Sequence, residues 1–229
     1  MKTNNKILKN KELWDKFWKS HFATGGVQWL LSFIRKNFNG RAVRYFMKTY
    51  FNNDGLFVEM GSGSSQSSVF IQHKFRKFYC LDFSFEPLTH TKLVPTINGA
   101  VQGNLFHLPF SENSIDGIWN LGVMEHFTDN EIDAIFQEFH RVLKPEVCAI
   151  LFWPPLFGWY KFGALTIEKI LSLIKRRSIK LYPGEINLFR SKRKIRSFCK
   201  KHGFSLEHCR GIYLDLFNHV VVVIRKNSK

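Results

Sequence analysis

The chain has 229 residues and is 45% hydrophobic, so it is long enough to bury the core of one full α/β domain. It carries 34 Lys and Arg residues against 18 Asp and Glu residues, and no stretch approaches the roughly 20 apolar residues that span a bilayer. These values exclude a membrane-spanning protein. Its four cysteines have no C-x-x-C spacing, and the N-terminus leads into no long apolar run. This predicts a cytoplasmic protein without a signal peptide.

The net charge of +16 is distributed unevenly. Residues 1–50 carry 11 basic and 2 acidic side chains and 156–203 carry 13 and 2, whereas 51–155 carry 6 and 12. Two basic segments therefore flank an acidic centre. We expect the flanks to meet an anionic partner, such as a membrane surface, a nucleic acid or an anionic substrate. Basic residues on solvated faces would give the same counts.

Residues 1–50 read as a helical extension. Apolar residues at helical spacing predict a helix within 6–22, and further helices follow over 27–38 and 41–50. We interpret this extension as a lid over an active site, although packing into the core explains its aromatic residues equally well. Those residues include Trp14, Phe17, Trp18 and Trp29.

The segment 56–65 organises the rest of the chain. An apolar run ends in Glu59 and Met60 and is followed by Gly61-Ser62-Gly63, which predicts a first strand, a tight turn and a helix from about 65 to 73. The glycines allow the backbone to approach a ligand that a Cβ atom would block. A plain surface turn is the alternative.

A second buried strand over 78–81 ends at Asp82. Asp82 follows the glycines by about 20 residues, where a nucleotide-binding α/β fold presents a carboxylate to ribose hydroxyls. The alternative role for Asp82 is to cap a helix over 83–91. The other predicted elements are strands over 100–104, up to 120, 147–153, 204–211 and 217–224, and helices over 129–143 and 191–202, with Asp129 and Ser191 as N-caps.

Residues 156–190 form an insert that belongs to no strand of the sheet. Tyr160, Ala164, Ile167, Leu171 and Ile174 alternate at steps of four and three, which predicts an amphipathic helix with a basic end. Such a helix suits a lid or a peripheral position at the inner membrane surface. An ordinary packed helix with a solvated basic end is the alternative.

Five short motifs stand in order over residues 56–155, and a sixth segment, 195–204, precedes the closing strands. In this order and spacing they resemble class I S-adenosylmethionine (SAM)-dependent methyltransferases of the type-11, ubiquinone/menaquinone methyltransferase-like subgroup. The five motifs are Val58-Glu59-Met60-Gly61-Ser62-Gly63, Leu108-Pro109-Phe110, Asn113-Ser114-Ile115-Asp116, Glu125-His126 and Arg141-Val142-Leu143-Lys144-Pro145.

The resemblance implies an α/β, Rossmann-like sheet of about seven mostly parallel strands with an antiparallel last strand and helices on both faces. It implies a SAM-dependent methyltransferase domain over 51–229. By the same resemblance, Gly61, Ser62 and Gly63 lie against the methionine part of SAM, and Glu59 supports its amino group. Asp82 binds the ribose, Phe83, Asn104 and Leu105 lie at the adenine, and Asn120 and Leu121 line the methionine side.

The chain departs from the family pattern at three places: Asn104 replaces the common Asp, Ser65 replaces a third glycine, and Glu146-Val147 replaces Gly-Gly. A nicotinamide fingerprint, G-x-G-x-x-G, would require glycine at Gln66. The acid before the turn also suits a cationic amino group better than a pyrophosphate. We therefore expect SAM rather than a dinucleotide as the cofactor.

Methyl transfer from SAM requires a base only when the acceptor must lose a proton. His126 follows the fourth strand and is the predicted base, although the pair Glu125-His126 also reads as a structural feature of the loop. No histidine–carboxylate spacing predicts a metal site. We expect a small-molecule or amphiphilic acceptor, lipid-linked or glycan-type. One alternative is a nucleic-acid methyltransferase, although this chain has no Asn/Asp-Pro-Pro-Tyr/Phe motif of the base-methylating kind after the fourth strand. The other alternative is a non-catalytic partner protein with the SAM-binding fold.

Overall fold

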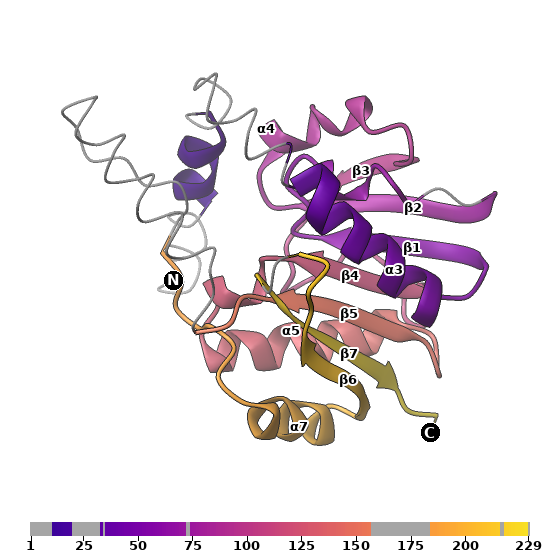
Figure 1. The fold of residues 1–229 in the computed structure, drawn as a ribbon, viewed down its shortest axis with the longest axis vertical. Helices are drawn as coiled ribbons and strands as arrows, with labels where there is room; N and C mark the ends of the chain where they lie inside the picture. Colours follow the sequence, from indigo (N-terminus) through magenta and orange to yellow (C-terminus); the bar gives the residue numbers. More distant parts are fainter. Residues whose placement is uncertain are drawn as a thin grey trace.

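The computed structural model describes residues 11–19, 33, 35–71, 74–156, 184–215 and 218–228. Its centre is a seven-stranded sheet in the order β3-β2-β1-β4-β5-β7-β6 (Figure 1). β7 is antiparallel to both of its neighbours, and the other strands run in one direction. The strands are β1 (Asp54–Met60), β2 (Phe75–Asp82), β3 (Gly99–Gln102), β4 (Gly117–Leu121), β5 (Cys148–Trp153), β6 (Phe204–Gly211) and β7 (Val220–Lys226).

The strand order reverses between β1 and β4, because β2 and β3 lie on one side of β1 while β4 and β5 lie on the other. In open α/β sheets, ligands bind at such a switch point, outside the carboxyl ends of the strands. The predicted fold, a Rossmann-like sheet with an antiparallel last strand, is confirmed.

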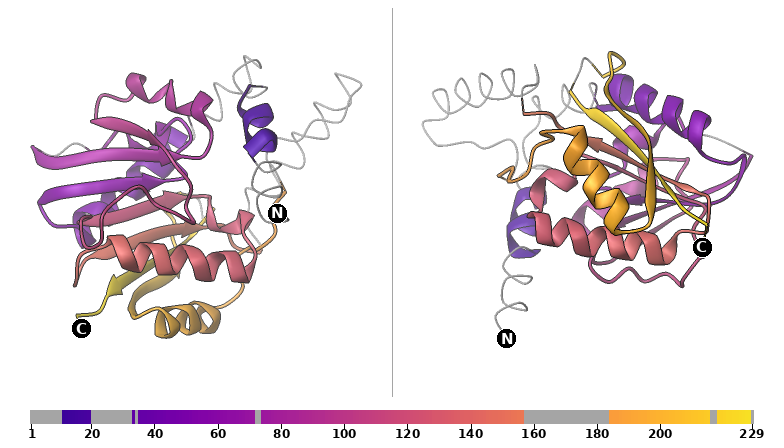
Figure 2. Two further views of the ribbon diagram at one scale, coloured as in Figure 1. Left: turned by 180° about the vertical axis from the view of Figure 1, so that it is seen from behind. Right: turned by 90° about the horizontal axis from the view of Figure 1, so that it is seen from below.

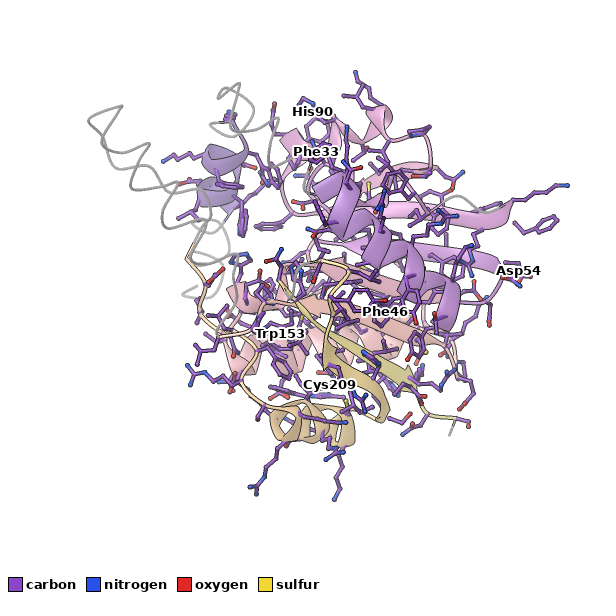
Figure 3. The ribbon with its side chains drawn as sticks, in the orientation of Figure 1. Phe33, Phe46, Asp54, His90, Trp153 and Cys209 are labelled. Carbon is purple, nitrogen blue, oxygen red and sulfur yellow. The ribbon has the colours of Figure 1, made fainter. Side chains whose placement is uncertain are left out.

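Helices cover both faces of the sheet (Figure 2). One face packs against α3 (Gly40–Tyr50), which contributes Ala42, Val43, Phe46 and Met47 to a buried cluster. The other face packs against α5 (Asp129–Val142) and α7 (Lys192–Lys201), and its core contains Trp153 and Cys209 (Figure 3). The shorter helices are η1 (Arg35–Asn39), η2 (Gln66–Ser68), α4 (Phe85–Leu88), η3 (Thr91–Leu93) and η4 (Met124–His126).

The predicted helix over 65–73 is wrong for the residues that are described there. Only η2, one 3-10 turn, follows the glycine turn, and Ser65 before it has a left-handed backbone with φ of 53°. Serine side chains compete for hydrogen bonds and weaken a helix, and Ser68 Oγ donates to Glu59 instead. α3 contacts η2 closely, since a Cβ on Gly40 would lie 3.0 Å from Ser67 O. α3 thus covers the sheet face beside the short connection between β1 and β2 that contains η2.

The ends of α5 and α7 show how the sequence limits its helices. Thr128, not the predicted Asp129, is the N-cap of α5, and its N–H donates to Glu131 Oε2 at 2.8 Å. Asp129 begins the helix and pairs with Lys194 of α7 at 2.6 Å. Ser191 caps α7 as predicted, accepting the N–H of Lys194.

Several expectations fall partly or wholly outside the described residues. The predicted helix over 27–38 is described only at Phe33 and from 35 onward, where η1 runs into α3. The amphipathic helix of the insert lies entirely outside. Residues 11–19 form a helix within the predicted range 6–22. In the parts of the chain that are described, no helix combines the length and the apolar character that crossing a membrane requires.

Candidate active site

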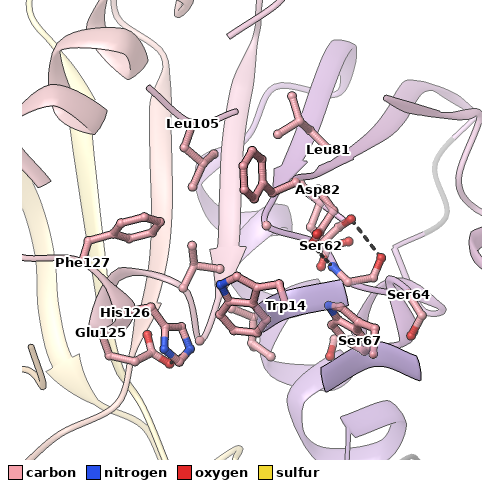
Figure 4. Close-up of a pocket in the computed structure, with 18 of the residues that line it drawn as sticks. Trp14, Ser62, Ser64, Ser67, Leu81, Asp82, Leu105, Glu125, His126 and Phe127 are labelled. Carbon is pink, nitrogen blue, oxygen red and sulfur yellow. Dashed lines mark hydrogen bonds and ion pairs between the residues drawn. The ribbon is translucent and has the colours of Figure 1, made fainter. Parts of the chain in front are cut away.

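A cavity of about 270 Å³ lies at the carboxyl ends of the strands, around the switch point between β1 and β4 (Figure 4). The turns after β1, β2, β3 and β4 form one wall, and the helix over 11–19 contributes another. The structure brings all but one of the predicted site residues to this cavity. These are Glu59, Gly61, Ser62, Gly63, Asp82, Phe83, Asn104, Leu105, Leu121 and His126.

The glycine turn is tied to the end of β2. The N–H groups of Gly61 and Ser62 both donate to Leu81 O, at 2.8 and 3.0 Å. Gly61 and Gly63 have left-handed backbones, with φ of 66° and 53°. A Cβ on Gly61 would lie 2.8 Å from Val123 Cγ2, so both conformation and space require glycine at this position.

Asp82 lies at the end of β2 and joins the two turns on this side of the cavity. Its Oδ2 accepts the N–H of Gly63 at 2.7 Å (Figure 4). Its Oδ1 accepts the N–H of Ser84 at 2.9 Å. Burial raises the pKa of Asp82 to about 6, against the lowering effect of these backbone hydrogen bonds. The N-cap of α4 is Ser84, so the alternative that Asp82 caps this helix is wrong.

Glu59 is a second buried carboxyl group on the same wall, on the adjacent strand β1. Burial raises its pKa to about 7, although Ser68 Oγ donates to Oε2 at 2.7 Å. The described residues that line the cavity include no Lys or Arg. A buried carboxylate without a cationic partner favours a ligand that brings positive charge.

Two unpredicted polar residues, Asn39 and Gln66, also line the cavity. Among the described residues, none donates a hydrogen bond to Asn39 Oδ1 or Gln66 Oε1, and both atoms are buried. Buried acceptors normally have partners, so these two suit the amino or hydroxyl groups of a ligand. The sequence carries no local signal for them, because their position depends on the packing of α3 against η2.

Asn120 does not line the cavity, contrary to the prediction. Successive residues of a strand point to opposite faces, and Ile118 packs in the core beneath α5 while Trp119 packs beneath α3. Asn120 therefore points toward the α5 face and is fully buried. Leu121 lines the cavity as predicted.

The loop after β4 places Glu125 and His126 on the opposite wall. Burial raises the pKa of Glu125 to about 8, so this carboxyl group is largely neutral at pH 7. Burial lowers the pKa of His126. The His126 ring lies with Nδ1 3.4 Å from Gly184 O and Nε2 3.7 Å from Glu125 Oε1.

The helix over 11–19 contributes aromatic side chains to the cavity. Trp14, Phe17 and Trp18 line it, and the Trp14 ring lies edge-on to His126 at 4.9 Å between centroids. Asp15 Oδ1 accepts a hydrogen bond from Ser84 Oγ at 2.6 Å, which joins this helix to the turn after β2. The predicted lid role of the extension is compatible with this position.

A further histidine, His219, lines the cavity from the start of β7 together with Asn218. Neither residue is among the predicted site residues. His219 Nδ1 lies 2.7 Å from Oδ2 of the buried Asp215, four residues earlier. The spacing Asp-x-x-x-His was the available signal, but its position near the cavity follows only from the pairing of β7 with β5.

Residues 58–151 match the family model described as a methyltransferase domain. Magnesium protoporphyrin IX methyltransferase from Synechocystis PCC 6803, in a structure with bound SAH, has the same fold with a TM-score of 0.66 at 16% identity, covering 96% of this chain and 99% of that one. A SAM-dependent methyltransferase from Methanosarcina mazei has a TM-score of 0.59 at 14% identity, covering 80% and 98%. Among curated protein sequences, none matches at a significant level.

Geranyl diphosphate C-methyltransferase from Streptomyces coelicolor is also similar, with a TM-score of 0.53 at 12% identity and coverage of 81% of this chain and 76% of that one. The matched domain and the shared fold support a class I, SAM-dependent methyltransferase, without distinguishing a subgroup. The methyltransferase domain implies SAM as the cofactor. The chemistry of the cavity fits SAM, because two buried carboxyl groups and a glycine turn line it and suit a ligand that carries an ammonium group and hydroxyl groups.

Proposed function

We propose that the protein transfers the methyl group of SAM to a small-molecule acceptor, lipid-linked and glycan-type compounds included. The observation that carries this proposal is the pair of buried carboxyl groups, Glu59 and Asp82, at the ends of neighbouring strands. A dinucleotide would bring a pyrophosphate toward these acids, whereas SAM brings an ammonium and a sulfonium group. The charge of the cavity therefore favours SAM.

SAM supplies an activated methyl group, so the protein needs to bind and orient the two reactants and to exclude water from the site. In this proposal the backbone of 61–63 holds the methionine part and Glu59 its amino group. Asp82 accepts hydrogen bonds from the ribose, and Phe83 and Leu105 flank the adenine. Asn104, whose Oδ1 accepts the N–H of Phe106 at 3.0 Å, shapes the turn beside that position.

The other half of the cavity supports an acceptor with an apolar body. Trp14, Phe106, Phe127 and Pro154 line the cavity together with His126. The sequence predicts His126 as the base of that half. A lower rate after His126→Ala would support that role, whereas an unchanged rate would return His126 to a structural role and leave another residue of the cavity to act as the base. Nucleic acid is the less favoured acceptor, because the described lining offers no Lys or Arg to phosphates. The intact set of Gly61, Gly63 and Asp82 in the cavity lining argues against a non-catalytic partner protein.

Residues 40–50 of the predicted lid form α3, which packs on one face of the sheet and belongs to the domain core. We further propose that the earlier part of the extension, around the helix over 11–19, forms a lid on the catalytic domain 51–229 and that the insert 156–190 permits peripheral contact with a membrane. The basic composition of the insert and the aromatic wall from 11–19 support these assignments. Co-sedimentation with anionic liposomes at low salt tests the membrane contact, which is rejected when the protein stays in the supernatant.

Calorimetric titration with SAM tests the proposed function. We expect binding by the wild type and at least a tenfold loss of affinity, about 1.4 kcal/mol, in Asp82→Ala. Glu112→Ala, which removes an exposed acid of a distant loop, is the matched control and should bind as the wild type does. Absence of heat with the wild type would overturn the proposal.

A further inference from the structure

The loop between β6 and β7 holds a second polar pair, Asp215 and His219, that methyl transfer as proposed above does not use. His219 Nδ1 lies 2.7 Å from Asp215 Oδ2, and the other oxygen, Oδ1, accepts the backbone N–H of Asn218 at 3.2 Å. Asp215 is completely buried, and His219 is 8% exposed. Both oxygens of the carboxylate are therefore engaged, which fixes its orientation toward the ring.

Strand pairing places His219 at the cavity. Val220, the first residue of β7, pairs with Trp153, the last residue of β5, so His219 stands at the carboxyl edge of the sheet. The end of β4 joins β5 there, with Gly122 N donating to Phe152 O at 3.0 Å. With neighbouring strands about 4.8 Å apart, His219 lies roughly 10 Å along the edge from β4. This is the half of the cavity that lies away from Glu59 and Asp82.

The contact between Asp215 and His219 also determines which ring nitrogen of His219 is free. A carboxylate only accepts hydrogen bonds, so Asp215 holds the proton on Nδ1 and leaves the lone pair on Nε2. Among the described residues, none hydrogen-bonds to Nε2, and the ring packs edge-on to Phe152 with 6.2 Å between centroids. A histidine that is oriented in this way by a buried carboxylate has the arrangement of a general base.

His126 is less well arranged for this role. Its Nδ1 makes only a long contact of 3.4 Å to Gly184 O, and the neighbouring Glu125 lies 3.7 Å from Nε2. Neither contact fixes one tautomer as the Asp215–His219 pair does. The two histidines thus stand in the same cavity with different orienting partners.

We propose that His219 is the general base for methyl transfer to oxygen, that Asp215 is its positioning residue, and that the acceptor is a phenol-type compound with an aromatic body. This inference rests on the proposed function. In the step, the acceptor O–H proton moves to Nε2 of His219 and the oxygen forms a bond to the methyl carbon. The methyl–sulfur bond breaks with its electron pair on sulfur, and the imidazolium later releases its proton to water.

The acceptor class follows from the surroundings. Pro154 and aromatic side chains line the cavity, and no described lining residue is Lys or Arg. A planar apolar body therefore fits better than a phosphate or a carboxylate-rich sugar. A phenolic hydroxyl is also acidic enough for an imidazole to deprotonate as the new bond forms.

The test uses 4-nitrophenol as probe on full-length protein saturated with S-adenosylhomocysteine, and follows the absorbance of the phenolate against pH. We expect the wild type to shift ionisation of the bound probe to lower pH by at least one unit, because His219 accepts its proton. His219→Gln and Asp215→Asn should remove most of this shift, whereas His126→Gln should keep it. The methyl ether, 4-nitroanisole, controls for binding without a proton.

The proposal is overturned when His219→Gln retains the shift, when only His126→Gln removes it, or when the wild type does not bind the probe. The affinity for S-adenosylhomocysteine, measured on the same samples, distinguishes a failure of the His219 proposal from a failure of the proposed function. Normal affinity without a probe shift rejects the base and leaves methyl transfer in place, whereas no affinity rejects the proposed function. Asp215→Asn provides a second variant should His219→Gln unfold.

Discussion

Cofactor binding should change with pH because of Glu59. Burial raises the pKa of this carboxyl group to about 7. The ligand's ammonium group needs the ionised carboxylate, so raising the pH through 7 should strengthen binding. With this pKa, roughly one Glu59 in eleven is ionised at pH 6 and about three in four at pH 7.5. The ionisation of Glu59 alone should therefore raise the affinity for S-adenosylhomocysteine about eightfold over this interval, or about 1.2 kcal/mol.

Isothermal calorimetry at pH 6 and 7.5 measures this change, and Glu59→Gln isolates its source. The variant should bind about tenfold or more weakly at pH 7.5, because the charge-assisted hydrogen bond is lost, and its affinity should change much less with pH. The interval stays below pH 8 so that the ligand's own amino group remains protonated.

The matched ligand is 5′-methylthioadenosine, which keeps the nucleoside and lacks the amino-acid part. Its affinity should not respond to Glu59 and should fall only toward pH 6 and below, as Asp82, with its pKa of about 6, becomes protonated. An eightfold rise that persists in Glu59→Gln, or that appears equally with 5′-methylthioadenosine, would refute the assignment of Glu59 to the amino group.

Three further predictions follow from the same wall and its surroundings. Gly63→Ala should weaken binding of S-adenosylhomocysteine at least tenfold in calorimetry, because φ is 53° and the new Cβ would lie 2.6 Å from the Trp18 ring. Unchanged affinity would contradict the role of the glycine turn in holding the ligand. Trp18→Ala should speed release of the ligand in stopped-flow measurements about tenfold if the helix over 11–19 covers the site, whereas Lys16→Ala, an exposed change on that helix, should not. Burial raises the pKa of Glu125 from 4.5 to about 8, so the folded state binds its proton more tightly than the unfolded state does. Stability from this group is therefore complete below pH 4.5 and is lost as the pH rises from there through 8. Glu125→Gln should flatten the fall of Tm between about pH 5 and 8, and an unaltered profile would contradict the buried, protonated state of Glu125.

The sheet could be predicted because its strands are continuous apolar runs that end in polar residues. Glu59 and Asp82 each close such a run on neighbouring parallel strands, so their meeting at one edge of the sheet followed from the sequence order. The short connection after β1 could not be predicted, because a run of serines gives only a weak helix signal. Its conformation depends on α3, which covers this face of the sheet.

The rest of the site depends on long-range packing. Asn120 and Leu121 were both expected at the cavity, but strand alternation lets only one of two successive residues face it, and that residue is Leu121. Asp215 and His219 belong to a loop whose position is set by the antiparallel pairing of β7 with β5. The aromatic residues of 11–19 carried a helical pattern but no local signal of which surface they cover.

A crystal structure of the full chain with S-adenosylhomocysteine would show whether the cavity holds the cofactor as proposed. We expect the ribose hydroxyls within hydrogen-bond distance of Asp82, the amino group beside Glu59, and the sulfur facing the half of the cavity that holds His219. A ligand bound elsewhere, or a ribose that does not contact Asp82, would contradict it.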